Sequence, residues 1–224
     1  MDEGSEPVIG VVGGSGGVGA STFAAVLTLA AGPAVLVDLD CSGGGVDVLL
    51  GIEQSSGARW SGLRVAGGHL DPDDLVGGLP RFGSIAVLAA DVGEIDPDAV
   101  RQVIGAAARR GPVVVDLPRV GGPERAAALE RCDLVVVLVR TDVSGLVAAH
   151  TMVTGMPEVA LGLVARRGEV DADEAAVLVG AALIGVLPPA GGRLVLDPVH
   201  PPRTALRVAA GVLAALRDRR ALAS

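Results

Sequence analysis

The chain has 224 residues, half of them hydrophobic, with a net charge of −8 and a mean hydropathy of +0.55. This length suits one domain with a full core, while the negative charge and the aromatic content of 1% argue against a nucleic-acid surface built on basic patches and stacking rings. All 18 basic residues are arginines, which excludes any mechanism that needs a lysine of this chain.

The N-terminal segment and the two cysteines indicate the compartment. The residues before Val8 are acidic, unlike the start of a signal peptide, and the longest apolar stretch is interrupted at Gly32-Pro33. Cys41 and Cys132 lie far apart and match no metal-binding spacing. We therefore expect a cytoplasmic protein with reduced thiols and no integral membrane segment.

Short aliphatic runs alternate with longer segments rich in Ala and Leu, which is typical of a parallel sheet between two layers of helices. The expected strands are Val8–Val12, Ala34–Leu39, Ile85–Ala89, Val113–Leu117, Leu134–Val139, Leu161–Ala165 and Leu183–Leu187. The expected helices are Ser21–Ala31, Asp96–Arg110, Pro123–Arg131, Val143–Met156, Ala172–Ala182 and Thr204–Arg220, the last of them packed on the sheet. Residues 53 to 83 have the weakest pattern and predict a surface excursion. The predicted fold class is α/β, with a doubly wound, mainly parallel sheet in a single domain over residues 1–224.

A glycine-rich loop joins the first strand to the first helix. It reads Gly13-Gly14-Ser15-Gly16-Gly17-Val18-Gly19-Ala20-Ser21-Thr22. A strand, a glycine loop and a helix start place backbone N–H groups and the positive end of a helix dipole around an anion. The residues predicted to bind a nucleotide phosphate are Gly16, Gly17, Val18, Gly19, Ala20, Ser21 and Thr22. A tight turn without a ligand is the other interpretation.

Two phosphate-binding motifs compete for this loop. As G-x-G-x-x-G, the glycines are Gly14, Gly16 and Gly19, and Asp38 or Asp40 supplies the later acid of a dinucleotide-binding fold. As a P-loop, residues 15–22 align with the deviant pattern K-G-G-x-G-K-[ST]-[ST], keeping its glycines and hydroxyls but neither lysine. A P-loop fold places the first strand between the 113–117 and 134–139 strands, whereas a dinucleotide fold pairs it with the 34–39 strand.

A second acid favours the P-loop interpretation. The run Val113-Val114-Val115-Asp116 is an aliphatic strand that ends in a carboxylate, as in the Walker B arrangement that holds Mg²⁺ through water. A dinucleotide-binding fold gives no reason for this acid.

These motifs together resemble the CpaE/TadZ-like branch of the MinD/ParA ATPases, which are P-loop proteins with a deviant Walker A loop. The CpaE-like and septum-site-determining proteins of actinobacteria are the most similar group. The resemblance runs through the loop at 13–22, the V-L-V-D-L-D-x-x-G-G-G-V-D-x-L-L-G stretch at 35–51, Arg59-Trp60 and V-V-V-D-L-P-R at 113–119. CpaE relatives often carry a receiver-like domain ahead of the ATPase, and we expect none in this chain because few residues precede Val8.

The resemblance implies ATP or ADP with Mg²⁺ as the cofactor. It implies Ser21, Asp38, Asp40 and Asp116 as Mg²⁺ ligands, partly through water, and Asp40 as the catalytic residue that orients the attacking water. The alternative role for these carboxylates is to cap strand-end turns. Ala20 and Ser15 stand where the family has lysines, so weak binding and negligible hydrolysis are expected. Arg166-Arg167 stands where MinD relatives commonly have an adenine-reading Asn.

The expected function is that of a degenerate MinD/ParA-like ATP-binding protein that localises or scaffolds a Tad-type pilus or secretion apparatus, or a septum-site apparatus. It would act as a homodimer, bind protein components of that apparatus and be recruited by them to the membrane or the pole. The alternatives are a slow but genuine ATPase switch in which arginine replaces lysine, and a Rossmann-type dinucleotide-binding protein. Two residues near the site have expected structural roles: Asp47 caps a short helix that ends at Leu50, and Trp60 is a packing anchor.

Overall fold

A computed structural model describes residues 5–63, 70–91, 93–189, 196–197 and 200–223. Within these residues eight strands form one sheet in the order β3-β4-β2-β5-β1-β6-β7-β8. The strands are β1 (Val8–Gly13), β2 (Val35–Asp38), β3 (Arg81–Phe82), β4 (Ile85–Leu88), β5 (Val113–Asp116), β6 (Leu134–Arg140), β7 (Leu161–Arg166) and β8 (Ala182–Leu187). All neighbours are parallel except β3 and β4. The predicted fold class and the seven predicted strands are confirmed.

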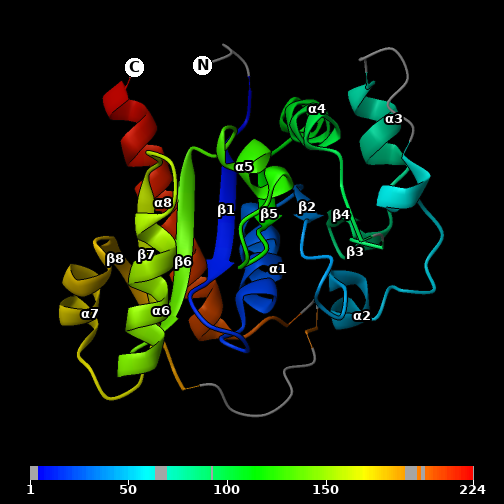
Figure 1. Ribbon diagram of the computed structural model, residues 1–224. Coiled ribbons are helices and arrows are strands. Elements are labelled where there is room, and N and C mark those ends of the chain that lie inside the picture. Colours follow the sequence, from blue (N-terminus) through cyan, green and yellow to red (C-terminus); the bar gives the residue numbers. More distant parts are fainter. Residues whose placement is uncertain (1–4, 64–69, 92, 190–195, 198–199, 224) are drawn as a thin grey trace.

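Helices cover both faces of the sheet (Figure 1). One face packs against α1 (Ala20–Ala31), α2 (Val46–Leu50) and α8 (Arg203–Ala223). The other packs against α4 (Pro97–Ala108), α5 (Pro123–Leu129), α6 (Val143–Thr154) and α7 (Ala172–Val179). The central strands are mostly aliphatic, as expected for strands with both faces buried between helix layers.

The strand order decides between the two loop motifs. β1 pairs with β5 on one side and with β6 on the other, and β2 pairs with β5 and β4. The arrangement expected for a P-loop fold is therefore confirmed, and the Rossmann-type alternative is wrong. Asp38 and Asp116 are register partners across β2 and β5. The topology thus brings the glycine loop and both strand-end acids to one edge of the sheet.

Residues 53 to 83 contain more regular structure than their pattern indicates. A short 3-10 helix covers Trp60–Gly62, α3 covers Pro72–Gly77, and β3 forms an antiparallel hairpin with β4. Asp71 accepts hydrogen bonds from the N–H groups of Asp73 and Asp74 at the start of α3. This capping signal was readable in the sequence, whereas a strand as short as β3 has no detectable periodicity. The part of this segment at 64–69 lies outside the described residues.

The last two elements refine the predicted boundaries. α7 ends at Val179 rather than Ala182, because Gly180 adopts a left-handed φ of +78° and β8 begins at Ala182. α8 packs against α1 and β8 with Val208, Val212 and Leu216 buried, which confirms its predicted place on the sheet.

No helix in the described part of the chain has both the length and the apolar character needed to cross a membrane. Cys41 and Cys132 are both free thiols, as predicted, and burial raises the pKa of Cys132 to about 12.

Candidate functional site

A cavity of about 460 Å³ opens at the edge of the sheet where β1, β2 and β5 end. Its walls are the loop between β1 and α1, the chain from β2 into α2, and the residues that follow β5. The lining residues include Gly16, Gly17, Val18, Gly19, Ala20, Ser21, Thr22, Asp38, Asp40 and Asp116. These are all of the predicted site residues, so the structure brings the whole predicted set together around one cavity.

The glycine loop presents free backbone donors to this cavity. Gly17 and Gly19 have positive φ angles of 70° and 89°, which residues with a side chain rarely adopt. Within the described residues, the N–H groups from Ser15 to Ala20 have no hydrogen-bond acceptor. The Ser15 hydroxyl is buried without a partner, which is unusual for a buried polar group. Gly16 and Gly17 are exposed, so their N–H groups are open to a ligand or to water. A phosphate in this loop would offer acceptors to both kinds of donor.

Arg166, at the end of β7, supports the outer side of the loop. Its Nε donates to the Val18 carbonyl at 2.8 Å and its Nη1 donates to the Pro188 carbonyl at 3.0 Å. A Cβ on Gly19 would lie 2.9 Å from Nη2 of this side chain, and the φ of 89° is one that residues with a side chain rarely adopt, so a substitution there strains the loop. Burial lowers the pKa of Arg166. Arg166 is thus hydrogen-bonded to the loop and does not line the cavity.

Asp38 organises the turn after β2. Its Oδ1 accepts from the N–H of Asp40 at 2.9 Å, and its Oδ2 accepts from Val46 at 3.0 Å and Ala90 at 3.3 Å. The indole N–H of Trp60 donates to the Asp38 carbonyl at 2.8 Å. Burial raises the pKa of this carboxyl to about 6, although the main-chain bonds oppose the shift. Both oxygens are engaged by backbone, which supports the turn-capping alternative; a metal role for Asp38 stays a prediction.

Asp116 and Asp40 occupy different electrostatic environments. Asp116 is buried, and burial together with the charge of Asp38 raises its pKa to about 8, while the nearby Ser21 hydroxyl acts in the opposite direction. Asp40 is partly exposed, and its Oδ1 accepts from the N–H of Ser42 at 3.1 Å. Within the described residues, no three His, Cys, Asp or Glu side chains form a group that could hold a metal ion. Mg²⁺ would therefore depend on phosphate oxygens, Ser21 and water for most of its ligands.

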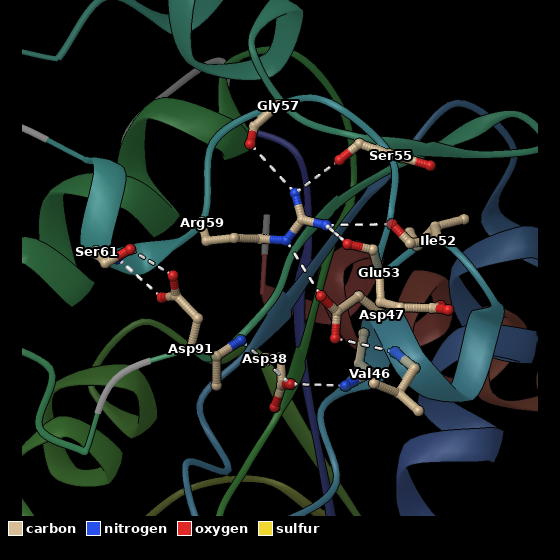
Figure 2. Close-up of polar contacts among 12 residues, drawn as sticks. Asp38, Val46, Asp47, Ile52, Glu53, Ser55, Gly57, Arg59, Ser61 and Asp91 are labelled. Carbon is tan, nitrogen blue, oxygen red and sulfur yellow. Dashed lines mark hydrogen bonds and ion pairs between the residues drawn. The ribbon is translucent and has the colours of Figure 1, made fainter.

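Arg59 holds the wall formed by α2 (Figure 2). Its guanidinium donates to the carbonyls of Ile52, Glu53, Ser55 and Gly57, and its Nε forms an ion pair with Asp47 at 3.2 Å. Asp47 lies inside α2, whose N-cap is Gly45 without a side-chain cap. Asp47 is therefore not the N-cap residue, although its Oδ1 accepts from the Val48 N–H at 2.9 Å within the first turn of α2. Its Oδ2 pairs with Arg59, twelve residues further along the chain.

Arg59→Lys is expected to lower the free energy of unfolding by about 1–3 kcal/mol. A lysine keeps the charge, but its single ammonium group cannot donate to four carbonyls and a carboxylate at once. Thermal unfolding measures the loss, and limited proteolysis should cut residues 52–58 faster in the variant. Arg81→Lys, on the exposed face of β3, is the matched control and should unfold like the parent protein. Equal stability of both variants would contradict this structural role.

The chain is similar in sequence to known proteins. No protein-family model matches the chain. Uncharacterised proteins from two strains of Mycobacterium tuberculosis are each 42% identical to it over 185 residues, which cover 79% of this chain and 53% of theirs. The chain thus spans about half the length of the curated relatives it matches.

Solved structures establish the fold. A ParA family ATPase from Chlorobium tepidum superposes with a TM-score of 0.72 over 95% of this chain and 92% of its own, at 18% identity. The chain has the MinD/ParA fold. The septum-site-determining protein MinD of Pyrococcus horikoshii, solved with Mg-ADP, gives a TM-score of 0.67 over 93% of this chain and 97% of its own, at 19% identity. MinD in the MinC:MinD complex of Aquifex aeolicus gives 0.68, over 93% and 96%, at 18% identity.

The glycine loop contributes no basic side chain to the cavity. Ala20 and Ser15, which align with the lysines of the deviant P-loop pattern, both line it. Arg119 also lines the cavity and is the one basic residue among the described lining residues, although it was not among the predicted site residues. Its place directly after the Asp116-Leu117-Pro118 strand end was the available signal, since residues that follow parallel strands gather at this edge.

Proposed function

We propose that this chain is a degenerate MinD/ParA-like protein of the CpaE/TadZ-like branch that binds ATP or ADP with Mg²⁺ and hydrolyses it negligibly. One observation carries the proposal: the loop offers unpaired N–H groups from Ser15 to Ala20 in a cavity that contains no lysine. The resemblance of the motifs and the MinD/ParA fold support the choice of nucleotide.

Each part of the site then has a role in binding. The N–H groups of Gly17, Val18, Gly19 and Ala20 would hold the phosphates, and Thr22 would contact the phosphate nearest the sugar. The hydroxyl of Ser21 would be the direct protein ligand of Mg²⁺, with Asp40 and Asp116 reaching it through water and Asp38 shaping the turn beside it. Bound Mg²⁺ would offset part of the phosphate charge.

The same site is poorly equipped for hydrolysis. A preorganised electrostatic stabiliser contributes about 3–4 kcal/mol to a transition state, which is about 10²–10³ in rate. Lysines that would act on the phosphates are replaced by Ala20 and Ser15. Asp40 remains to orient a water, but without those charges we expect turnover that is lower by several orders of magnitude.

Calorimetry with Mg-ATP and Mg-ADP, together with a phosphate-release assay, tests the proposal. We expect measurable binding of both nucleotides and almost no phosphate release. Gly19→Ala is the matched control, because a methyl group there collides with Arg166 and strains a left-handed residue; it should abolish binding. Turnover at the rate of an intact MinD/ParA ATPase, or binding that survives Gly19→Ala, would contradict the proposal.

The slow-ATPase alternative has one observation in its favour, the presence of Arg119 in the cavity wall. The phosphate-release assay distinguishes this alternative from the leading proposal. Slow turnover that disappears in Asp40→Asn would favour a genuine switch, because Asp40 is the residue placed to orient water.

Self-association is the second part of the proposed function. We propose a homodimer in which Ser15, residues 43–50 and residues 118–122 of each copy meet. Replacement of both lysines removes positive charge from this face, so the loops approach without a bound triphosphate to offset repulsion. Sedimentation should show the same dimer with and without Mg-ATP. A monomer under both conditions at tens of micromolar contradicts this, and a dimer that needs ATP would indicate a switch.

The proposed cellular role follows from nucleotide binding and self-association. A cytoplasmic dimer would bind protein components of a pilus, secretion or division apparatus and be recruited by them to the membrane or the pole. Co-purification with such components from the native cell, compared with Gly19→Ala, tests whether recruitment depends on the nucleotide site.

A further inference from the structure

We propose that Arg119 supplies the positive charge at the nucleotide phosphates that the loop of this chain lacks, and that Arg125 positions it. This inference rests on the proposed nucleotide binding and assigns the binding charge to a different element, the turn after β5.

Arg119 lies at the nucleotide cavity, and its side chain is available to bind a ligand. It follows Asp116 by three residues and lines the same cavity as the loop residues Ser15 to Thr22. Its side chain is exposed, and in the described part of the chain no carboxylate lies within ion-pair distance of its guanidinium. An arginine with an internal partner would have to break that pair before binding phosphate, and Arg119 does not.

The charge of the cavity creates the need for such a group. Asp38, Asp40 and Asp116 all line it, and a bound triphosphate adds further negative charge. The loop contributes only neutral N–H groups. A guanidinium presents N–H donors in a fork that matches two phosphate oxygens, so one arginine can neutralise charge and fix orientation together.

The other arginine close to the loop cannot take this role. Arg166 donates to the carbonyls of Val18 and Pro188 and does not line the cavity. Its bonds hold the loop from outside, and releasing them would leave the Val18 carbonyl without its donor. The cation for the phosphates must therefore come from the β5 side.

Arg125 holds the turn that carries Arg119. It lies in α5 with 6% of its surface exposed, and its Nη1 donates to the Arg119 carbonyl at 2.7 Å. Within the described residues it has no ion-pair partner, and burial lowers its pKa. Burying an unpaired guanidinium is costly. The main-chain bond therefore constrains the backbone from which the Arg119 side chain reaches the cavity.

The two arginines also share a second cavity of about 550 Å³ between α5 and α6, which Gly14 lines as well. Arg119 thus stands at the boundary between this cavity and the nucleotide cavity. Of these two cavities, Gly121 and Gly122 line only the second, together with the buried Arg125.

Calorimetric titration of Arg119→Gln with Mg-ATP, Mg-ADP and AMP tests the inference. We expect Mg-ATP binding to weaken by about 10- to 100-fold, Mg-ADP binding by less, and AMP binding not to change, because charge-assisted bonds of this kind act on the terminal phosphates. The dependence of Mg-ATP affinity on salt should also become shallower. Arg81→Gln makes the same change of charge on β3 and should bind like the parent protein.

Two further variants separate charge from folding. Arg119→Lys should recover part of the lost affinity, because it restores a cation without the fork. Arg125→Lys should show the same selective loss for Mg-ATP as Arg119→Gln, with AMP binding retained as evidence that the site is still folded. Loss of AMP and Mg-ATP binding together would assign Arg125 a merely structural role.

Two outcomes distinguish a wrong role for Arg119 from a wrong proposed function. If the parent protein binds no nucleotide, both are wrong. If the parent protein binds Mg-ATP and Arg119→Gln binds it equally well, nucleotide binding stands and the inference about Arg119 is overturned.

Discussion

Ala20→Lys should tighten Mg-ATP binding by about 10- to 100-fold, measured by calorimetry. Ala20 is the first residue of α1 and lines the cavity, so a lysine there returns a cation to the phosphate end of the loop. A hydrogen bond to a charged group contributes about 1.5–3 kcal/mol, and each 1.4 kcal/mol is about tenfold in affinity. Without a bound anion the positive end of the helix dipole opposes a cation at this position by about 0.3–1 kcal/mol, so the phosphate is what makes the lysine favourable.

The control for this variant changes the net charge elsewhere. Val177→Lys introduces the same charge on α7, where Val177 is 81% exposed, and should leave nucleotide affinity unchanged. Unchanged affinity in Ala20→Lys itself would mean that the loop is only a structural turn. The double variant with Ser15→Lys should add hydrolysis only if two copies pair through their loops.

Asp116→Asn should raise the melting temperature much more at pH 9 than at pH 5. The pKa of Asp116 in the folded protein is about 8, above its ordinary value of 3.8. Between these values the folded state holds a proton that the unfolded state releases, so the free energy of unfolding falls as pH rises through this window. At pH 9 the parent protein bears the full cost of a buried charge, on the order of several kcal/mol, which the amide avoids.

Thermal unfolding across pH 5–9 without nucleotide checks the direction of this pH dependence. About 2–4 °C per kcal/mol is expected for a chain of this size, so the difference at pH 9 should be easy to resolve. Asp173→Asn, an exposed position in the first turn of α7, is the control and should follow the parent curve. A difference that is constant with pH, or larger at pH 5, would contradict the assigned burial of Asp116.

The parts of this molecule that were predictable are those specified by local patterns. Continuous aliphatic runs identified the seven parallel strands, and the glycines between strand and helix identified the loop that lines the cavity. The strand order itself has no local signal, and only the acid at the end of the 113–116 strand pointed to it. Asp47 shows the limit, because a residue near a helix start predicts a cap, yet its carboxylate binds Arg59. Contacts of this kind depend on how separate loops meet.

Arg119 and Arg166 illustrate the same limit from the functional side. Both are arginines that follow or end a strand at the same edge of the sheet, and their sequence surroundings do not say which one faces the cavity. The fold distinguishes them. Arg166 donates hydrogen bonds to two carbonyls, whereas Arg119 lines the cavity. Residue type predicted the chemistry available to this site, and tertiary packing determined which residue can use it.

The hydrogen bond from Trp60 to the Asp38 carbonyl has a practical consequence. Trp60 is the single tryptophan of the chain and there is no tyrosine, so fluorescence excited in the indole band comes from one ring. That ring is 6% exposed and is bonded to the strand end that forms one side of the cavity. Its emission responds to the polarity and the hydrogen bonding around the indole, and a rearrangement of the β2 end would change both. The protein therefore carries its own optical reporter for the site, readable without any attached dye.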